Sequence, residues 1–195
     1  MGNTAEESGV NGKDFAAVAE QISLHGLGFI QVKLPEHQRL HVWHPDLPRR
    51  SCFAQSAIHN HRFSFESQVI AGTQINRRWK VIEDPRGGHD LISHDGPRSE
   101  KGGRLSYVAG RVHVDDPQLE VHQIGQRYFM PMLQYHDTPN EGVVITLMTK
   151  LTEGTVHAAS LIEHGYEFDQ SFDRFQLSAG ELWAFVVDAF KRVGQ

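Results

Sequence analysis

The stretch IHNHRFSFESQVIAG, residues 58–72, determines how the rest of this sequence is interpreted. His59 and His61 stand two residues apart, and side chains along an extended strand alternate between its faces, so both imidazoles are expected on one side. At a rise of ~3.3 Å per residue their backbone positions would be about 6.6 Å apart, which allows the two rings to converge on one ion. A turn near residues 62–64 would bring Glu66 beside them on a neighbouring strand.

Two imidazoles and one carboxylate form the facial triad that is typical of non-haem Fe(II) centres, which keep further positions open for dioxygen or substrate. A His-x-His pair on a strand can also be an incidental structural feature. A second segment, GQRYFMPMLQYHDTPN, begins at residue 125 and supplies Gly125, Pro131, His136 and Asn140 at fixed spacing. The two segments together favour a metal site over an incidental pair.

These segments resemble the two signature motifs of the cupin superfamily, G-x5-H-x-H-x3,4-E-x6-G and G-x5-P-x-G-x2-H-x3-N. Phe53 stands where the first motif begins with Gly, and Gly72, expected to end a strand with positive φ, falls one residue early. Leu133 replaces the Gly after Pro in the second motif. The resemblance implies that four side chains hold a metal ion, namely His59, His61, Glu66 and His136.

Hydrophobic periodicity predicts a chain of many short strands between two helices. A helix is expected over residues 14–24, and a hairpin should join strands at 28–34 and 40–44. The sequence SAGE at 178–181 is a capping box, which predicts a helix that ends near residue 192. Further strands are predicted at residues 67–70, 74–82, 105–114, 119–124, 143–150 and 157–162. With the cupin resemblance, this order predicts an all-β fold with flanking helices, the double-stranded β-helix or jelly-roll barrel.

Residues 84–104 are rich in Gly and Pro and are predicted to form a long loop. Such a loop could cover the mouth of the barrel and bring His89 and His94 to a substrate, or it could simply be solvated. Residues 1–12 are polar and predict a disordered lead, so a single cupin domain is expected over residues 13–195.

Composition narrows the class of protein. The chain has 195 residues, 39% of them hydrophobic and 22% charged, which is ordinary for a globular domain. A formal net charge of -5 without a basic stripe argues against a nucleic-acid partner. The single cysteine, Cys52, excludes an internal disulfide and is expected to be a small buried apolar residue. No membrane-length apolar run or signal segment is seen, so a cytoplasmic location is expected; the resemblance to cupins leaves a homodimer open.

Within the superfamily, IHNHRFSF resembles the His-(Asp/Asn)-His run of cysteine dioxygenases and related thiol dioxygenases. The resemblance implies a metal-dependent dioxygenase that acts on a small organic substrate, with Fe(II) favoured and Mn, Ni, Co, Cu or Zn also compatible with the donor set. A thiol substrate is not implied, because those enzymes lack the cupin Glu and carry a downstream Tyr, where this chain has Glu153 and Gly154.

The predicted catalytic residues are Glu66, Gln134 and Tyr135. Glu66 is expected to act as a base, and Gln134, two residues before His136, should share its face of the strand. Gln134 is either a group that tunes the site or a polar residue satisfied by hydrogen bonds within the barrel. Arg39, Arg49 and Arg50 are either surface residues or a clamp for a substrate carboxylate. Two other functions stay open, a non-catalytic cupin that binds a small molecule or metal, and a metal-dependent isomerase or hydrolase.

Overall fold

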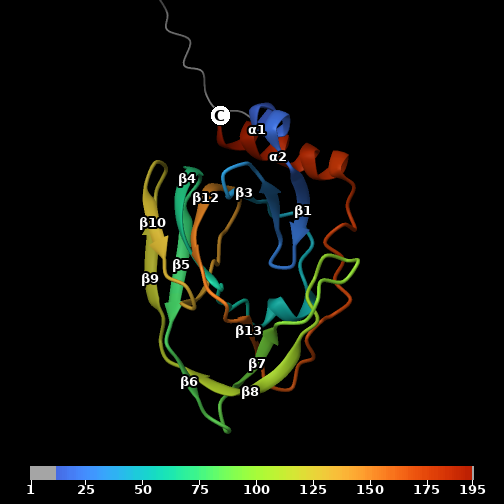
Figure 1. Ribbon diagram of the computed structural model, residues 1–195. Coiled ribbons are helices and arrows are strands. Elements are labelled where there is room, and N and C mark those ends of the chain that lie inside the picture. The colour runs from blue at the N-terminus through green and yellow to red at the C-terminus, as the bar shows by residue number, and fades with distance from the viewer. Residues whose placement is uncertain (1–11, 195) are drawn as a thin grey trace, which may run out of the picture.

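The computed structural model describes residues 12–194, which form a mostly β protein with two helices (Figure 1). The predicted disordered lead lies outside the described residues except for Gly12, which begins the first helix. The elements in chain order are α1 (Gly12–Val18), β1 (Gln21–His25), β2 (Phe29–Lys33), β3 (Gln38–Trp43), a 3-10 helix (Ser51–Ala54), β4 (Phe63–Ala71), β5 (Gln74–Trp79), β6 (Val81–Glu83), β7 (His89–His94), β8 (Tyr107–Val114), β9 (Gln118–His122), β10 (Arg127–Met130), β11 (Tyr135–Asp137), β12 (Val144–Glu153), β13 (Ala158–Glu163) and α2 (Ala179–Val193).

The strands form three antiparallel sheets. The largest has the order β1, β2, β3, β12, β4, β10, the second has the order β11, β5, β9, and the third has the order β13, β7, β8, β6. β12 lies between β3 and β4, and Ile145 and Thr146 within it are buried, as the apolar run at 143–150 predicts for a central strand. No closed barrel is formed by these sheets within residues 12–194, so the jelly-roll barrel stays a prediction.

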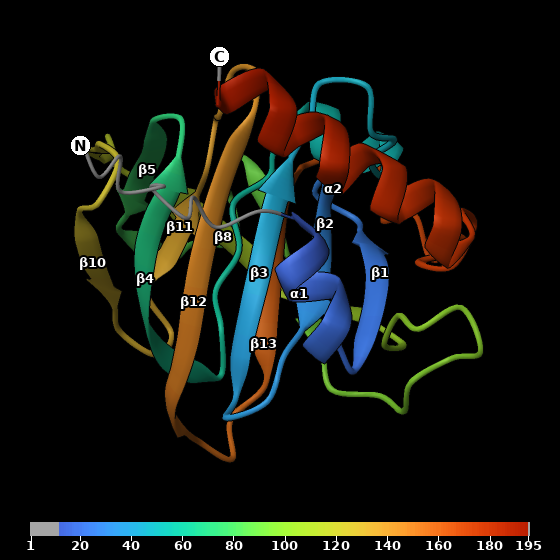
Figure 2. The same ribbon diagram turned by 90° about the horizontal axis from the view of Figure 1, so that it is seen from above.

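Both helices cover the outer face of the six-stranded sheet (Figure 2). α2 begins with the predicted capping box, in which Ser178 Oγ accepts from the Glu181 amide at 3.3 Å and the Glu181 carboxylate accepts from the Ser178 amide at 2.8 Å. Leu182, Val186 and Ala189 form the buried stripe of α2, which packs against the strands beneath it.

Two predicted elements differ from those observed. The helix expected over residues 14–24 ends at Val18, and β1 follows, because Ile22 and Leu24 pair with β2 and Leu24 is completely buried there. The loop expected over residues 84–104 contains β7, which pairs with both β8 and β13 and buries Ile92. In both cases pairing with another strand outweighs the local pattern.

The inner face of the six-stranded sheet packs against the four-stranded sheet. Phe29, Trp43 and Val144 from the first contact Ile92 and Ile162 from the second. The 3-10 helix closes this cluster, and its Cys52 is a buried free cysteine, as predicted. Neither helix in the described residues is long and apolar enough to cross a lipid bilayer.

Candidate metal centre

Backbone pairing brings the two predicted histidine segments together. The His59 amide donates to the His136 carbonyl at 2.9 Å, and the His136 amide donates to the His59 carbonyl at 2.8 Å. His136 lies in β11 and His59 precedes β4, so residues 77 positions apart become direct neighbours. Their ring centroids are 4.6 Å apart.

Asn60 explains why His59 and His61 face the same way. The Asn60 amide donates to the Ala159 carbonyl at 2.9 Å, and its buried Oδ1 accepts from the Ala159 amide at 2.7 Å. The middle residue of the His-x-His pair is thereby held against β13, and the two histidines project from the opposite side. The alternation predicted from the sequence is what places both rings in one cluster.

The three imidazoles converge on one point. His61 Nε2 and His136 Nε2 are 3.1 Å apart, and one ring nitrogen from each of the three histidines lies within 4.8 Å of the other two. Two nitrogens that each lie about 2.1 Å from one ion, at right angles, would be about 3.0 Å apart, so the observed separation suits shared ligation. His59 Nδ1 is 2.9 Å from the Ala57 carbonyl oxygen and donates to it, which leaves Nε2 with its lone pair.

The surroundings keep these rings neutral. Burial lowers the pKa of His59, although the Ala57 carbonyl partly opposes this. Burial, followed by the charges of neighbouring histidines, lowers the pKa values of His61 and His136 well below the ordinary value. Neutral imidazoles offer lone pairs at pH 7, which is the state that binds a metal ion.

Aromatic side chains pack around the cluster. The Phe63 and Phe65 rings lie 5.1 Å and 5.3 Å from the His61 ring, and Phe65 lies 6.3 Å from the His136 ring. These rings restrict the imidazoles and exclude water from one side of the cluster.

The predicted fourth ligand, Glu66, is not brought to the cluster. β4 begins at Phe63 and runs without the expected turn, so Phe63 and Phe65 share the face of His61 while Glu66 takes the opposite face. There the Glu66 carboxylate pairs with Arg127 at 2.7 Å, on a side chain that is 43% exposed. Glu66 is therefore not placed to bind a metal ion at the histidines or to act as a base there.

Gln134 and Tyr135 also lie away from the space in front of the histidines. Gln134 Nε2 donates to the Trp79 carbonyl at 3.1 Å and to the Tyr135 carbonyl at 3.0 Å, so it ties β11 to β5. Tyr135 packs with the cluster around Ile58. Neither side chain lines the cavity described next.

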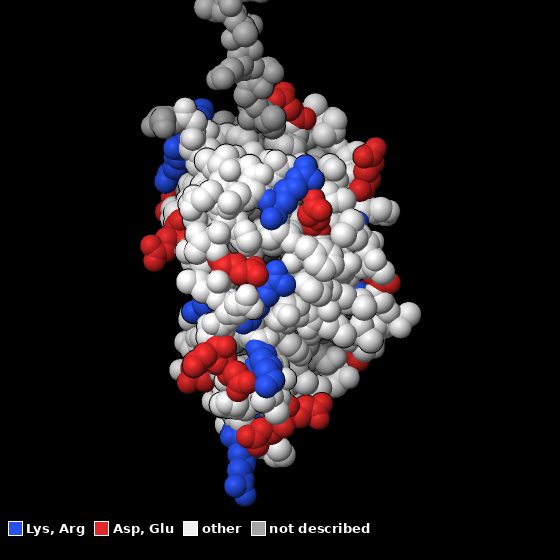
Figure 3. Space-filling view, turned by 90° about the vertical axis from the view of Figure 1, so that its left-hand side faces the viewer, with Lys and Arg blue, Asp and Glu red and all other residues white. Residues whose placement is uncertain are grey.

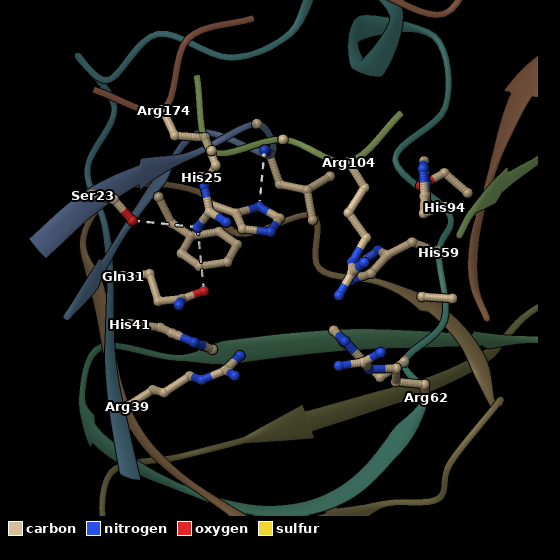
Figure 4. A pocket seen from close by; sticks show the side chains of 18 of the residues that line it. Ser23, His25, Gln31, Arg39, His41, His59, Arg62, His94, Arg104 and Arg174 are labelled. Carbon is tan, nitrogen blue, oxygen red and sulfur yellow. Dashed lines mark hydrogen bonds between the residues drawn. The ribbon is translucent and has the colours of Figure 1, made fainter. Parts of the chain in front are cut away.

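A cavity of about 450 Å³ opens in front of His59 and His61 (Figure 4). His94, in the segment for which a lid was one of two alternatives, lines it, whereas His89 does not. Arg39, Arg50 and Arg62 line it as well, and Arg49 does not. The lining also includes His25, His41, Arg98, Arg104 and Arg174. No motif predicted them, because they come from separate strands and loops with no common spacing.

Comparisons with known proteins add little to this geometry. No protein-family model and no curated protein matches the chain. A crystal structure of hydroquinone 1,2-dioxygenase PnpCD, in complex with Cd²⁺ and 4-hydroxybenzonitrile, is similar to it with a TM-score of 0.34 and 14% sequence identity. The similarity covers 80% of this chain and 83% of that one. We therefore infer function from the residues of the site.

Proposed function

We propose that this protein is a cupin-like, metal-dependent oxidoreductase, a dioxygenase that holds a divalent ion on His59, His61 and His136 and acts on a small organic molecule. The observation that carries the proposal is the convergence of neutral ring nitrogens, with 3.1 Å between His61 Nε2 and His136 Nε2, beside a cavity large enough for a small ligand.

Three ligands favour a reactive site over a structural one. Structural zinc sites are usually closed by four protein ligands, whereas catalytic sites keep positions open. Among the described residues, no carboxylate or cysteine joins the three histidines. An ion held by His59, His61 and His136 would act as a Lewis acid, and iron in that place would also supply redox chemistry.

Fe(II) is the proposed ion, and the support is the resemblance of IHNHRFSF to the thiol dioxygenase run. The placement of Glu66 strengthens that resemblance, because those enzymes also lack the cupin Glu. Zn on three histidines is the competing choice, since a three-histidine zinc site is suited to hydrolysis. The metal and the use of oxygen must therefore be measured together.

The protein's own residues supply the rest of the site. Asn60 holds the His-x-His segment on β13, and Ala57 fixes the tautomer of His59. Glu153, the one acidic residue in the cavity lining, pairs with Arg62 at 2.7 Å and with Lys150. It is therefore held by cations and is not a free general base.

The test begins with elemental analysis of protein produced without added metal. We expect about one equivalent of iron in the wild type and a loss of at least tenfold in H61A and in H136A. H157A is the matched control, since the His157 side chain is 56% exposed and lies outside the cluster; it should keep its metal. E66Q should also keep its metal, because Glu66 pairs with Arg127.

Oxygen uptake decides between the chemistries. Iron-loaded protein should consume dioxygen in the presence of an organic substrate, and H61A should not. Bound zinc with no oxygen uptake would favour the isomerase or hydrolase alternative, and H61A with unchanged metal content would show that the centre is misassigned.

A further inference from the structure

The cavity is basic although the chain is acidic. Eight of its lining residues are Lys or Arg and one, Glu153, is acidic, whereas the whole chain has a formal net charge of -5. On the face shown in Figure 3, basic and acidic side chains are interspersed. Positive charge has thus gathered in the cavity for a reason other than composition.

Most of these cations form no ion pair with a described residue. Glu153 pairs with Arg62 and Lys150, which accounts for those two. Within residues 12–194, no ion pair is formed by the other six, which are Lys33, Arg39, Arg50, Arg98, Arg104 and Arg174. A ligand with negative charge would supply what the protein does not.

Three of the six lie close enough to repel one another. Arg39 extends from β3, Arg98 from the loop after β7, and Arg174 from the segment that precedes α2. Burial, and then the charges of Arg98 and Arg39, lowers the pKa of Arg174 to about 10. Burial, and then Arg98, likewise lowers the pKa of Arg39. This arrangement is unfavourable until an anion lies between the guanidinium groups.

Arg39 has a free guanidinium group. It forms no hydrogen bond or ion pair with a described residue, and it lies over the Phe63 ring at 5.2 Å. The same Phe63 ring is 5.1 Å from His61, so one aromatic side chain connects Arg39 to the histidine cluster. Arg39 is therefore available to a ligand that also reaches the histidines.

Arg174 is held in place. Its Nε donates to the Leu24 carbonyl at 3.1 Å, and its Nη2 donates to Ser23 Oγ at 3.3 Å (Figure 4). Figure 4 shows Arg39, His41 and Arg174 on one side of the cavity and His59 on the other. His41 Nε2 is buried without a hydrogen-bond partner in the described residues, so this side also offers an unused polar atom, and Arg50 Nε is another such atom in the cavity lining.

We propose that the cavity binds a small organic acid, with its carboxylate on Arg39 and Arg174 and its apolar body along the aromatic wall that leads to the histidines. Arg98 lies beside the carboxylate, and Phe29 and Phe63 contact the body. Guanidinium groups bind carboxylates bidentately, and a cavity of this size suits a single-ring or short-chain acid. The proposal rests on the proposed function, since it names the substrate class of the same site.

The test uses metal-free protein, so that a failed metal assignment does not obscure it. Benzoate is titrated into protein stripped with a chelator, with neutral benzamide of the same shape and inorganic phosphate as comparison ligands. We expect benzoate to bind at least tenfold more tightly than benzamide, and R39Q to weaken benzoate binding about tenfold. R127Q is the matched control, since Arg127 pairs with Glu66 outside the cavity, and its affinity for benzoate should be unchanged.

The stability of R39Q separates a ligand-binding role from a structural one. Because Arg39 repels its neighbours and forms no hydrogen bond, R39Q should have an unfolding midpoint at or above that of the wild type while it loses affinity for benzoate. Equal binding of benzoate and benzamide, unchanged benzoate affinity in R39Q, or binding of phosphate alone would overturn the proposal.

Discussion

His94 lines the cavity together with His59 and His61, but both of its ring nitrogens have hydrogen-bond partners within the protein. Nδ1 lies 2.6 Å from Ser106 Oγ and Nε2 lies 2.8 Å from Ser160 Oγ, so each nitrogen has a hydroxyl partner. The hydroxyls hydrogen-bond the neutral ring, and burial is the largest cause that lowers the pKa of His94 to about 4. His94 therefore holds the cavity wall together and has no ring nitrogen left for a metal ion.

The depressed pKa of His94 makes stability depend on pH. Between pH 6.5 and pH 4 the unfolded chain binds a proton at this residue and the folded chain does not, so the free energy of unfolding falls as the pH is lowered. We expect H94Q to lose less stability over that interval than the wild type, by about 2 kcal/mol. Urea unfolding at pH 6.5, 5.0 and 4.0 measures this difference.

The control for this measurement is H113Q, because the His113 side chain is 58% exposed. H113Q should follow the wild-type dependence on pH. If H94Q and the wild type lose the same stability between pH 6.5 and pH 4, His94 is not the group that couples protonation to unfolding.

At the scale of the element, the turn between β10 and β11 sets where His136 lies. Leu133 occupies the position of the cupin Gly and adopts a φ of 63°, a conformation that favours glycine. Its amide donates to the His61 carbonyl at 2.8 Å, which joins the two metal-motif segments. The turn that the motif needs is therefore formed without its Gly, at a cost in backbone strain.

L133G should relieve that strain. We expect the free energy of unfolding to rise by about 1 kcal/mol, because the left-handed conformation costs a non-Gly residue roughly 1–2 kcal/mol and the added freedom of Gly in the unfolded chain offsets part of the gain. Met132 is a neighbour of similar exposure that does not have a positive φ. M132G relieves no strain and only adds freedom to the unfolded chain, so it should lower stability. Equal destabilisation by both substitutions, in chemical denaturation, would contradict a strained turn.

Elements that depend on neighbouring residues could be predicted from the sequence, and those that depend on strand pairing could not. The hairpin of β2 and β3 and the capping box of α2 depend on neighbouring residues, and both were predicted. The prediction for Glu66 was wrong because the spacing of residues does not reveal whether the chain turns or continues as one strand. A shift by one residue along a strand moves a side chain to the opposite face. Ile22 continues the helical spacing of Val18 and Ala19, yet pairing with β2 makes it part of a strand.

The basic cavity was harder to predict from the sequence than the histidine cluster. Arg39 and Arg50 were considered as a carboxylate clamp, but Arg98 and Arg174 come from irregular segments that carry no periodic signal. Only the tertiary packing of these irregular segments around β3 brings the four residues together, and packing of this kind is not encoded in local spacing.

At the scale of the whole molecule, the histidine cluster lies where sheets meet. His59 forms a backbone bridge with His136 in the three-stranded sheet and another with Ser160 in the four-stranded sheet. The segment that carries His61 then continues into β4 of the six-stranded sheet. An ion held by the three histidines would cross-link segments from separate parts of the fold.

Removal of the metal should therefore lower the stability of the entire molecule. An ion present at about 100 times its dissociation constant adds ~2.7 kcal/mol to the free energy of unfolding, and for a chain of this size that corresponds to about 5–10 °C in melting temperature. We expect a chelator to lower the melting temperature of the wild type and of H157A by this amount, and to leave H61A unchanged because it has no ion to lose. Elemental analysis verifies that the chelator has removed the metal. If the metal-free wild type then melted at the same temperature, the ion would not connect the sheets, because an ion that joins them must raise the temperature at which they separate.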